Sequence, residues 1–130
     1  MDLCDHARAV RDNAHAPYSR FKVGAAIRTV SGAVFTGCNV ENLSYGLTIC
    51  AERVAIGSAV AAGARHFTCV AVVADTSEPV SPCGACRQVM AEFSVPRVVL
   101  ANRAGSVGVT LADLLPRATT GILDRPGGET

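Results

Sequence analysis

Apolar residues near the start of the chain recur every three or four positions, the spacing of one face of an α-helix. The residues in this pattern are Leu3, Ala7, Val10 and Ala14. Pro17 then ends the pattern, because proline has no backbone N–H for a helical hydrogen bond. The sequence therefore opens with a predicted helix that turns one apolar face toward a core.

The spacing next changes to two, which is typical of a half-buried β-strand. Apolar and polar residues alternate from Phe21 to Ile27, and a second predicted strand covers about 34–41. Ser31 and Gly32 lie between the two segments and favour a tight turn. Together the two segments predict a β-hairpin.

The segment from Cys50 to Ala62 consists largely of small and apolar residues, so this predicted helix is buried on more than one side. We expect Thr48 to cap its N-terminus and Gly63 to end it. The continuous apolar run 66–74 follows, and it predicts a central strand that is covered on both faces.

Turn residues divide the rest of the chain into short elements. In chain order these are a helix over 84–93, strands over 97–101 and 107–109, and a last helix capped by Thr110 and Asp113. The complete order is helix, hairpin, helix, strand, helix, hairpin, helix, which indicates an α/β fold. We expect one domain over 1–123 and a loose C-terminal tail over 124–130.

Composition narrows the classes of function. The net charge of +1 gives no sign of a nucleic-acid partner. No apolar run approaches the roughly 20 residues that cross a membrane, and the N-terminus lacks the apolar region of a signal peptide, so a cytoplasmic location is expected. Charged residues make up 18% of the chain, against about 25% in typical proteins. This low share favours burial of part of the surface in an oligomer.

Three of the six cysteines belong to a motif that can bind a metal. Glu52 follows Cys50 by two positions, and Pro82 precedes the pair Cys83 and Cys86. Catalytic zinc sites use three protein ligands and leave one position open, whereas structural sites use four. The N-terminus of a helix lowers the pKa of a thiol and so favours thiolate ligands. The motif therefore indicates a catalytic zinc site with a carboxylate beside it.

Other interpretations of these cysteines remain open. A lone Cys-x-x-Cys in a cytosolic protein can be a redox dithiol, although that leaves the pair Cys50 and Glu52 unexplained. A structural zinc site would need a fourth ligand, and His6, His15 and His66 do not stand at a suitable spacing. A zinc or thiol module without catalytic activity is therefore the alternative to an enzyme.

Four segments of the chain resemble the small homotetrameric zinc-dependent cytidine deaminase family. They are 16–26 (APYSRFKVGAA), 37–42 (GCNVEN), 50–53 (CAER) and 81–88 (SPCGACRQ). The resemblance implies a three-layer α-β-α sandwich with a mixed five-stranded sheet, and a homotetramer with shared active sites. It also implies one zinc ion per chain and hydrolysis of cytidine and 2′-deoxycytidine to the uridines with release of ammonia.

The same resemblance assigns the catalytic centre. Cys50, Cys83 and Cys86 resemble the zinc ligands, and Glu52 resembles the family's proton shuttle. In that role Glu52 takes a proton from water, protonates N3 of cytosine and later protonates the leaving amino group. Residues two apart on a regular helix face different ways, so Glu52 and Cys50 can converge only if Cys50 stands at the very start of the helix.

Arg53 follows Glu52 and is expected to act on the zinc ligands. A zinc ion bound by three thiolates carries a net charge of −1, and this excess negative charge weakens it as a Lewis acid. A guanidinium that donates hydrogen bonds to the sulfurs would withdraw part of the charge. The alternative is an arginine that only extends into solvent from the helix.

Asn39 and Glu41 lie two apart at the end of a predicted strand, so their side chains share a face. An amide and a carboxylate side by side can bracket a sugar hydroxyl, and the two residues resemble the family's readers of the ribose 3′-hydroxyl. Phe21 resembles the residue that stacks on the pyrimidine, and Tyr45 resembles one that approaches the site across a subunit boundary. Alternatively, Asn39 and Glu41 are only polar residues at the end of a strand, and Phe21 is part of the core.

One position departs from the family's pattern. Family members carry an aromatic residue soon after Leu-Leu-Pro, where a neighbouring subunit uses it to cover the base, and this chain has Thr119 instead. The departure leaves a second substrate class open, a modified cytosine nucleoside of the blasticidin S type. Deaminases of DNA or tRNA resemble His-x-Glu enzymes, and this chain has Cys-x-Glu.

Overall fold

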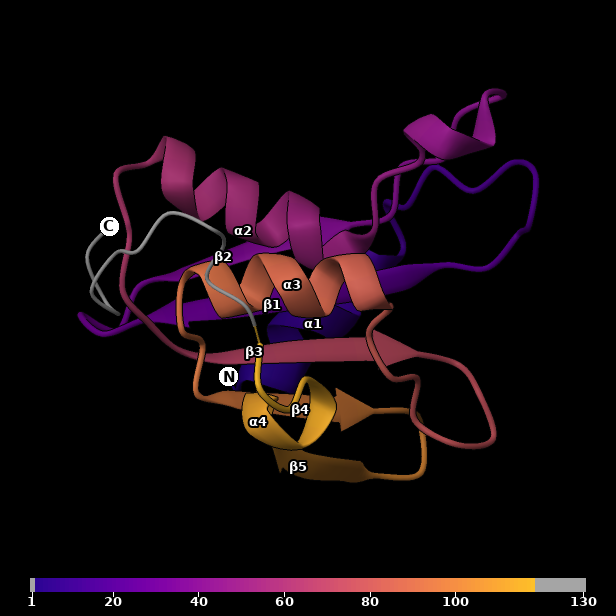
Figure 1. Ribbon diagram of the computed structural model, residues 1–130. Helices are drawn as coiled ribbons and strands as arrows, with labels where there is room; N and C mark the ends of the chain where they lie inside the picture. Colours follow the sequence, from indigo (N-terminus) through magenta and orange to yellow (C-terminus); the bar gives the residue numbers. More distant parts are fainter. Residues whose placement is uncertain (1, 119–130) are drawn as a thin grey trace.

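The computed structural model describes residues 2–118, so Thr119 and the expected tail over 124–130 lie outside the described residues (Figure 1). In chain order the elements are α1 (Leu3–Arg11), β1 (Val23–Thr29), β2 (Val34–Cys38), η1 (Tyr45–Leu47), α2 (Ala51–Ala61), β3 (Phe67–Ala74), α3 (Gly84–Glu92), β4 (Arg97–Ala101), β5 (Ser106–Thr110) and α4 (Leu111–Leu114). Apart from the short 3-10 helix η1, this is the order that the sequence predicts.

The strands form one mixed five-stranded sheet in the order β2-β1-β3-β4-β5. Only β3 and β4 are parallel, and α3 connects them as a crossover helix. The other neighbouring strands run antiparallel. The prediction of a central strand after α2 is confirmed, because β3 lies in the middle of the sheet and is almost entirely buried.

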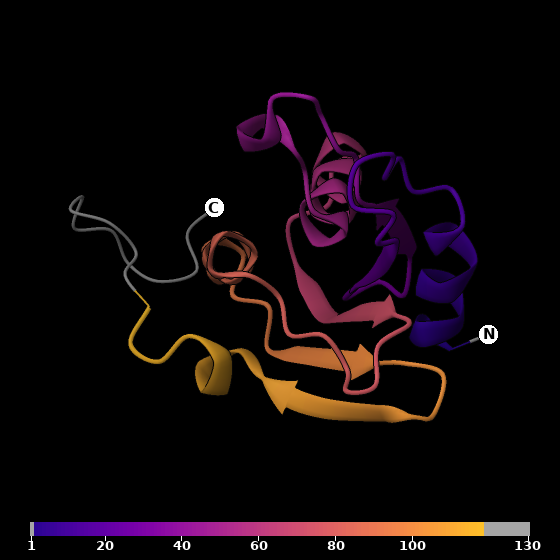
Figure 2. The same ribbon diagram turned by 90° about the vertical axis from the view of Figure 1, so that its right-hand side faces the viewer.

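Helices cover both faces of this sheet, which confirms the predicted three-layer sandwich (Figure 2). Side chains alternate between the faces along each strand. Those packed against α2 and α3 are larger on average and include Ile27, Val70, Val72, Val98 and Leu100. Those in the core cluster with α1 include Ala26, Ala71, Val73 and Ala101. Small side chains on that face let α1 lie close to the sheet.

The first helix is one turn shorter than its apolar spacing predicts. Asp2 and Asp5 form a capping box at its start, and the helix ends at Arg11 rather than near Ala14. The chain beyond Arg11 leaves the helix because the backbone of His15 bonds to the segment after β2: the His15 N–H donates to Asn39, and its carbonyl accepts from Glu41. Backbone pairing therefore overrides the helical pattern here.

The predicted cap of α2 is wrong. Cys50, not Thr48, is the N-cap residue, and Thr48 instead ends η1. The Thr48 hydroxyl accepts a hydrogen bond from the backbone N–H of Asn42 at 3.3 Å, which closes the loop that carries η1. At the other end of α2 the prediction is confirmed, since Gly63 follows the helix with a left-handed backbone conformation, φ 98°.

The predicted boundaries of the hairpin also differ. The first strand begins at Val23 rather than Phe21, and the second ends at Cys38 rather than near residue 41. Beyond Cys38 the chain stays extended and Val40 pairs with Ile49, so that the backbone groups of the two residues exchange hydrogen bonds of 2.9 Å. This short bridge lies directly before α2 and ties the segment after β2 to the start of that helix.

Candidate metal centre

The helices α2 and α3 each begin directly after a cysteine. Cys50 and Cys83 are their N-cap residues, with extended backbone conformations, and Cys86 lies in the first turn of α3. Serine, threonine, aspartate or asparagine usually caps a helix with its side chain, but neither of these cysteines does so. Both helices start at the same side of the molecule (Figure 1), so their N-termini direct the three thiols toward one point.

The spacing of the three sulfurs fits a zinc ion. All three Sγ atoms lie within 4.8 Å of one another, and Cys50 Sγ lies 3.8 Å from Cys83 Sγ. Sulfurs bound at 2.3 Å to a tetrahedral ion would be about 3.8 Å apart. Within residues 2–118, no fourth histidine, cysteine or carboxylate completes the cluster. The donor set therefore matches a site that leaves one position for water or substrate.

Arg53 makes the contact that the sequence predicts. Its guanidinium donates a hydrogen bond to Cys50 Sγ at 3.5 Å and another to the backbone carbonyl of Thr48 at 3.5 Å. Hydrogen bonds from Cys86 and Arg53, together with the arginine's charge, lower the pKa of Cys50 to about 5. The same contact with Cys50 raises the pKa of Cys86. The contact with Arg53 thus favours the thiolate form of Cys50, the form in which a cysteine binds a metal.

Glu52 is buried beside the sulfurs. Its side chain occupies the first turn of α2 and the residue is only 4% exposed. Burial raises the pKa of its carboxyl, and the neighbouring negative charge of Cys50 raises it further. Because Cys50 is the N-cap and not a helical residue, the two side chains can meet, as the sequence requires. A raised pKa lets a carboxyl beside a metal site both accept and donate a proton.

Asn39 and Glu41 lie on either side of Val40, in the segment after β2. The antiparallel bridge between Val40 and Ile49 holds this segment beside the residues that directly precede α2. The amide of Asn39 is buried and engaged by backbone: Nδ2 donates to the Phe21 carbonyl at 2.8 Å, and Oδ1 accepts from Val23 at 2.9 Å. Asn39 therefore holds the loop before β1 in place, a role that the sequence pattern does not predict.

Glu41 lines a cavity of about 400 Å³ beside this loop. Tyr18, Tyr45 and Thr48 form other parts of its wall, and the two tyrosine rings meet edge to face with their centroids 5.8 Å apart. Phe21 is partly exposed near the same loop rather than packed in the core. The structure thus places the four residues that are expected to contact substrate around the loop before β1. They are Phe21, Asn39, Glu41 and Tyr45.

Two residues with structural roles at the site were not identified from the sequence. Arg87 donates to the backbone carbonyls of Pro82 and Leu114, each at 2.7 Å, and so joins the turn before Cys83 to α4. Ser19 donates to the carboxylate of Glu41. Both residues lie within segments that carry the family resemblance, but nothing in the spacing of a single sequence assigns partners so distant along the chain.

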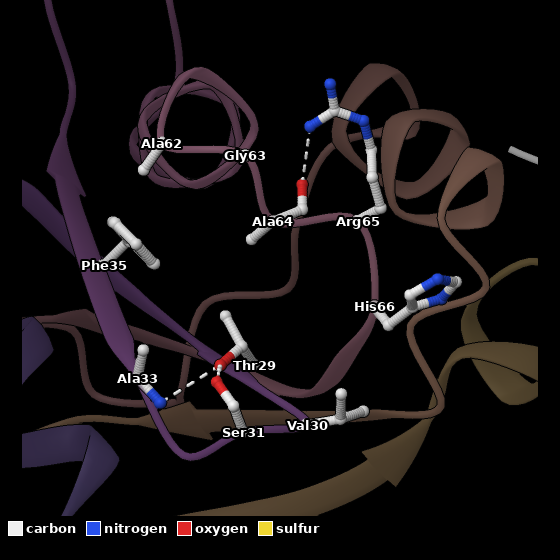
Figure 3. A pocket seen from close by; sticks show the side chains of 10 residues that line it. All are labelled: Thr29, Val30, Ser31, Ala33, Phe35, Ala62, Gly63, Ala64, Arg65 and His66. Atoms are coloured by element: carbon white, nitrogen blue, oxygen red, sulfur yellow. Dashed lines mark hydrogen bonds between the residues drawn. The ribbon is translucent and has the colours of Figure 1, made fainter.

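A second cavity, of about 390 Å³, lies at the C-terminal end of α2 (Figure 3). Its hydroxyl groups serve the turn between β1 and β2: Thr29 Oγ1 pairs with Ser31 Oγ at 2.9 Å and accepts from Ala33 N at 3.0 Å. The guanidinium of Arg65, which also lines the cavity, donates to the carbonyl of Ala64 (Figure 3) and to that of Val60. Because these polar groups are engaged in the fold, the cysteine cluster remains the candidate site.

Comparison with known proteins places the cluster in a family. Residues 2–102 match the sequence model described as the cytidine and deoxycytidylate deaminase zinc-binding region. A cytidine deaminase from Halalkalibacterium halodurans is 50% identical over 121 residues, which cover 91% of this chain and 92% of that protein. A blasticidin-S deaminase from Bacillus cereus is 38% identical over 107 residues, covering 75% of this chain and 76% of that protein.

A solved structure shares the fold. The crystal structure of cytidine deaminase from Burkholderia pseudomallei superimposes with a TM-score of 0.87 and 54% sequence identity, covering 90% of this chain and 96% of that one. Among residues 2–118, no helix is long and apolar enough to cross a membrane. Sequence and structure comparisons thus agree with the zinc-binding character of the cysteine cluster.

Proposed function

The chain belongs to the cytidine and deoxycytidylate deaminase family, and we propose that it is a zinc-dependent enzyme that hydrolyses cytidine and 2′-deoxycytidine to the uridines and ammonia. One observation carries the proposal: three cysteine sulfurs converge at two helix N-termini, with the buried carboxyl of Glu52 beside them. This arrangement combines a metal site that has an open position with a group that can move protons. A zinc or thiol module without activity would not need a buried carboxyl there.

We assign Cys50, Cys83 and Cys86 as the ligands of one zinc ion, supported by the separation of their sulfurs. When bound, zinc supplies a Lewis acid and lowers the pKa of a bound water. The protein contributes the two helix N-termini, whose partial positive charge stabilises the thiolates. It also contributes Arg53, which donates to Cys50 Sγ.

Glu52 is assigned the proton transfers. Hydrolysis breaks the bond between C4 and the amino nitrogen and forms a carbonyl at C4. The two protons of the consumed water must therefore go to N3 and to the leaving amino group. A single carboxyl beside both positions can carry each in turn, provided that its pKa lies near the working pH. The burial that raises the pKa of Glu52 supports this role.

The substrate side of the site is assigned to the loop region around the cavity. We propose that Asn39 and Glu41 read the sugar, that Phe21 stacks on the base, and that Tyr45 contacts the site from a neighbouring subunit. The position of Glu41 in the cavity wall supports its part in the first assignment, whereas the buried amide of Asn39 bonds to the backbone of Phe21 and Val23. The exposure of Phe21 and Tyr45 supports the other two, because an aromatic ring left in water gains by packing against a ligand or another chain.

Cytidine is the proposed substrate rather than a modified nucleoside. The experiment is to incubate the zinc-loaded protein with cytidine, 2′-deoxycytidine and blasticidin S, and to follow the loss of absorbance of the cytosine ring. We expect turnover of the first two and turnover of blasticidin S at less than about 1% of the cytidine rate, a discrimination of nearly 3 kcal/mol. A preference for blasticidin S would replace the proposed substrate, and no turnover of any of the three would contradict the deaminase assignment.

Arg53→Ala should weaken both zinc affinity and activity by about 10–100-fold, the usual effect of losing a group that hydrogen-bonds to a metal ligand. Competition with a chelator measures the zinc affinity. Arg53→Lys, which keeps the charge but loses the planar donor group, should show a smaller loss. Replacing one thiolate by a neutral ligand, as in Cys50→His, should reduce the need for Arg53. The double variant that combines Cys50→His with Arg53→Ala tests this. If its losses of zinc affinity and activity equal the two single losses combined, charge balance is not the reason for this arginine.

We also propose a homotetramer with shared active sites. The loop around η1 exposes large apolar side chains, among them Leu43 (77% exposed), Tyr45 (72%) and Leu47. On α2 the exposed side carries small uncharged residues such as Gly57 and Ala61, which would let a second helix approach closely. Exposed apolar surface of this kind is typical of an interface between chains.

Leu43→Asp should dissociate the assembly and lower kcat, because a buried charge at an interface is costly to desolvate. Sedimentation velocity at micromolar concentration measures the assembly, and Val30→Asp, at an exposed apolar position in the turn between β1 and β2, is the matched control. A wild-type protein that is monomeric and fully active would contradict the shared site.

The proposed location is the cytoplasm. All six cysteines lie within the described residues and none is paired in a disulfide, which supports a reducing compartment.

A further inference from the structure

Ser19 lies between the carboxylate of Glu41 and the backbone of Phe21. Its hydroxyl donates to Oε2 of Glu41 and accepts from the Phe21 N–H at 3.0 Å. A serine hydroxyl has one proton, and an ionised carboxylate can only accept. The direction of the Ser19 proton is therefore fixed by its two partners, and the carboxylate is fixed in turn.

The backbone of the same loop binds the other oxygen of Glu41. The N–H groups of Tyr18 and Ser19 donate to Oε1 at 3.0 Å and 3.2 Å. A carboxylate offers about four acceptor positions, two on each oxygen. Three of the four are thus occupied by the loop. The position that remains is on Oε2, the oxygen that Ser19 orients.

Glu41, Ser19 and Thr48 all line the cavity of about 400 Å³ described above, so a ligand in this cavity can approach the carboxylate. A group that binds Glu41 there must be a donor, and it can form one hydrogen bond. A single sugar hydroxyl meets both conditions, whereas a second donor would find no free acceptor on this carboxylate.

The loop also connects Glu41 to Phe21. The Ser19 hydroxyl accepts from the N–H of Phe21, and Asn39 Nδ2 donates to the carbonyl of Phe21 at 2.8 Å. Both backbone polar groups of Phe21 are therefore held by side chains. Arg20 forms the turn between them with a left-handed backbone, φ 59°. Because this conformation is unfavourable for arginine, the hydrogen bonds on either side must hold the turn in place.

We propose that Ser19 is a positioning residue that sets recognition of the sugar, because it holds Oε2 of Glu41 where the carboxylate accepts one hydrogen bond from the 3′-hydroxyl of the nucleoside. The proposal rests on the proposed function. In it Ser19 takes no direct part in the chemistry, so its loss should affect substrate binding more than turnover.

The experiment compares Ser19→Ala and Ser19→Thr with the wild type on cytidine and on 3′-deoxycytidine. For cytidine, Ser19→Ala should raise KM about tenfold, equivalent to about 1.4 kcal/mol, and change kcat less than about threefold. For 3′-deoxycytidine, which lacks the hydroxyl, KM should change less than about twofold. Ser19→Thr keeps a hydroxyl and should restore the KM for cytidine to within about threefold of the wild type.

Equal losses on both nucleosides would overturn the proposal, since Ser19 would then only stabilise the loop. Ser19 is exposed, so Ser19→Ala is expected to fold. Ser19→Cys is a second variant that keeps the volume and weakens the donor. It should also raise KM for cytidine more than for 3′-deoxycytidine, by a smaller factor than Ser19→Ala. Absence of that difference in both variants overturns the proposal as well.

A readout without substrate separates this proposal from the proposed function. The hydrogen bond from Ser19 is the main cause that holds the pKa of Glu41 below its usual range, with help from the backbone N–H groups of Ser19 and Tyr18 and from the charge of His15. An NMR titration of the Glu41 carboxyl should therefore show a higher pKa in Ser19→Ala and little change in Ser19→Thr. An unchanged pKa in Ser19→Ala overturns the Ser19 contact, whereas a wild type inactive on every cytosine nucleoside overturns the deaminase function.

Discussion

Glu52→Gln should lower kcat for cytidine by about 10²–10⁴-fold or more, while the protein keeps its full content of zinc. General acid and base catalysis contributes effects of this size, and this one carboxyl is assigned every proton transfer of the reaction. Glutamine has nearly the same shape as glutamate, so the buried position in α2 remains filled. It cannot, however, accept a proton from water or return one to the base.

Two measurements are needed for Glu52→Gln: initial rates from the loss of cytidine absorbance, and zinc content by atomic absorption. Glu78→Gln is the matched control, since Glu78 is an exposed glutamate in the loop before Cys83. The control should retain wild-type activity. A Glu52→Gln protein with near-normal turnover would eliminate Glu52 as the proton carrier. Loss of zinc together with activity would instead make this carboxyl part of the metal site.

Removing any one of the three sulfurs should remove the zinc and all measurable activity. We expect about one zinc per chain in the wild type and close to none in Cys50→Ala, Cys83→Ala or Cys86→Ala, because catalytic zinc sites depend on three protein ligands. Cys69→Ala is the matched control. This thiol is half-buried against the core beside α1, on the other face of the sheet, and its loss should leave the zinc content unchanged.

The zinc variants also test the two alternatives that the sequence leaves open. A redox dithiol would lose function in Cys83→Ala and Cys86→Ala but not in Cys50→Ala. A structural site would lose its fold together with its metal. Full retention of zinc in any of the three variants would contradict the assignment of three ligands.

Much of the fold could be predicted because the strands and helices carry strong periodic patterns. The apolar run of β3 identified the centre of the sheet, and the small residues of α2 identified a helix packed on more than one side. The predicted helix boundaries are wrong where segments distant in the sequence form backbone contacts. Backbone hydrogen bonds between His15 and the segment after β2 shorten α1, and the contact from Asn42 to Thr48 moves the cap of α2 to Cys50.

The metal centre could also be predicted from a local pattern in the sequence. Its residues stand next to one another in two short segments, and the chemistry of three thiols and a carboxylate is specific. The contacts that support the metal centre and the cavity around Glu41 could not be predicted in this way. Arg87 reaches Leu114, 27 residues further along the chain, and Ser19 reaches Glu41, 22 residues further along. Only the fold shows that these side chains meet their partners.

We propose that three cysteine sulfurs hold a zinc ion with which Glu52 deaminates cytidine. The most direct test is to remove zinc with a chelator, restore it in known amounts, and measure uridine and ammonia formed from cytidine at each step. We predict that activity disappears with the metal, returns in proportion to zinc up to about one ion per chain, and yields uridine and ammonia in equal amounts. Unchanged activity in the metal-free protein, or no conversion of cytidine in the zinc-loaded protein, would contradict the claim.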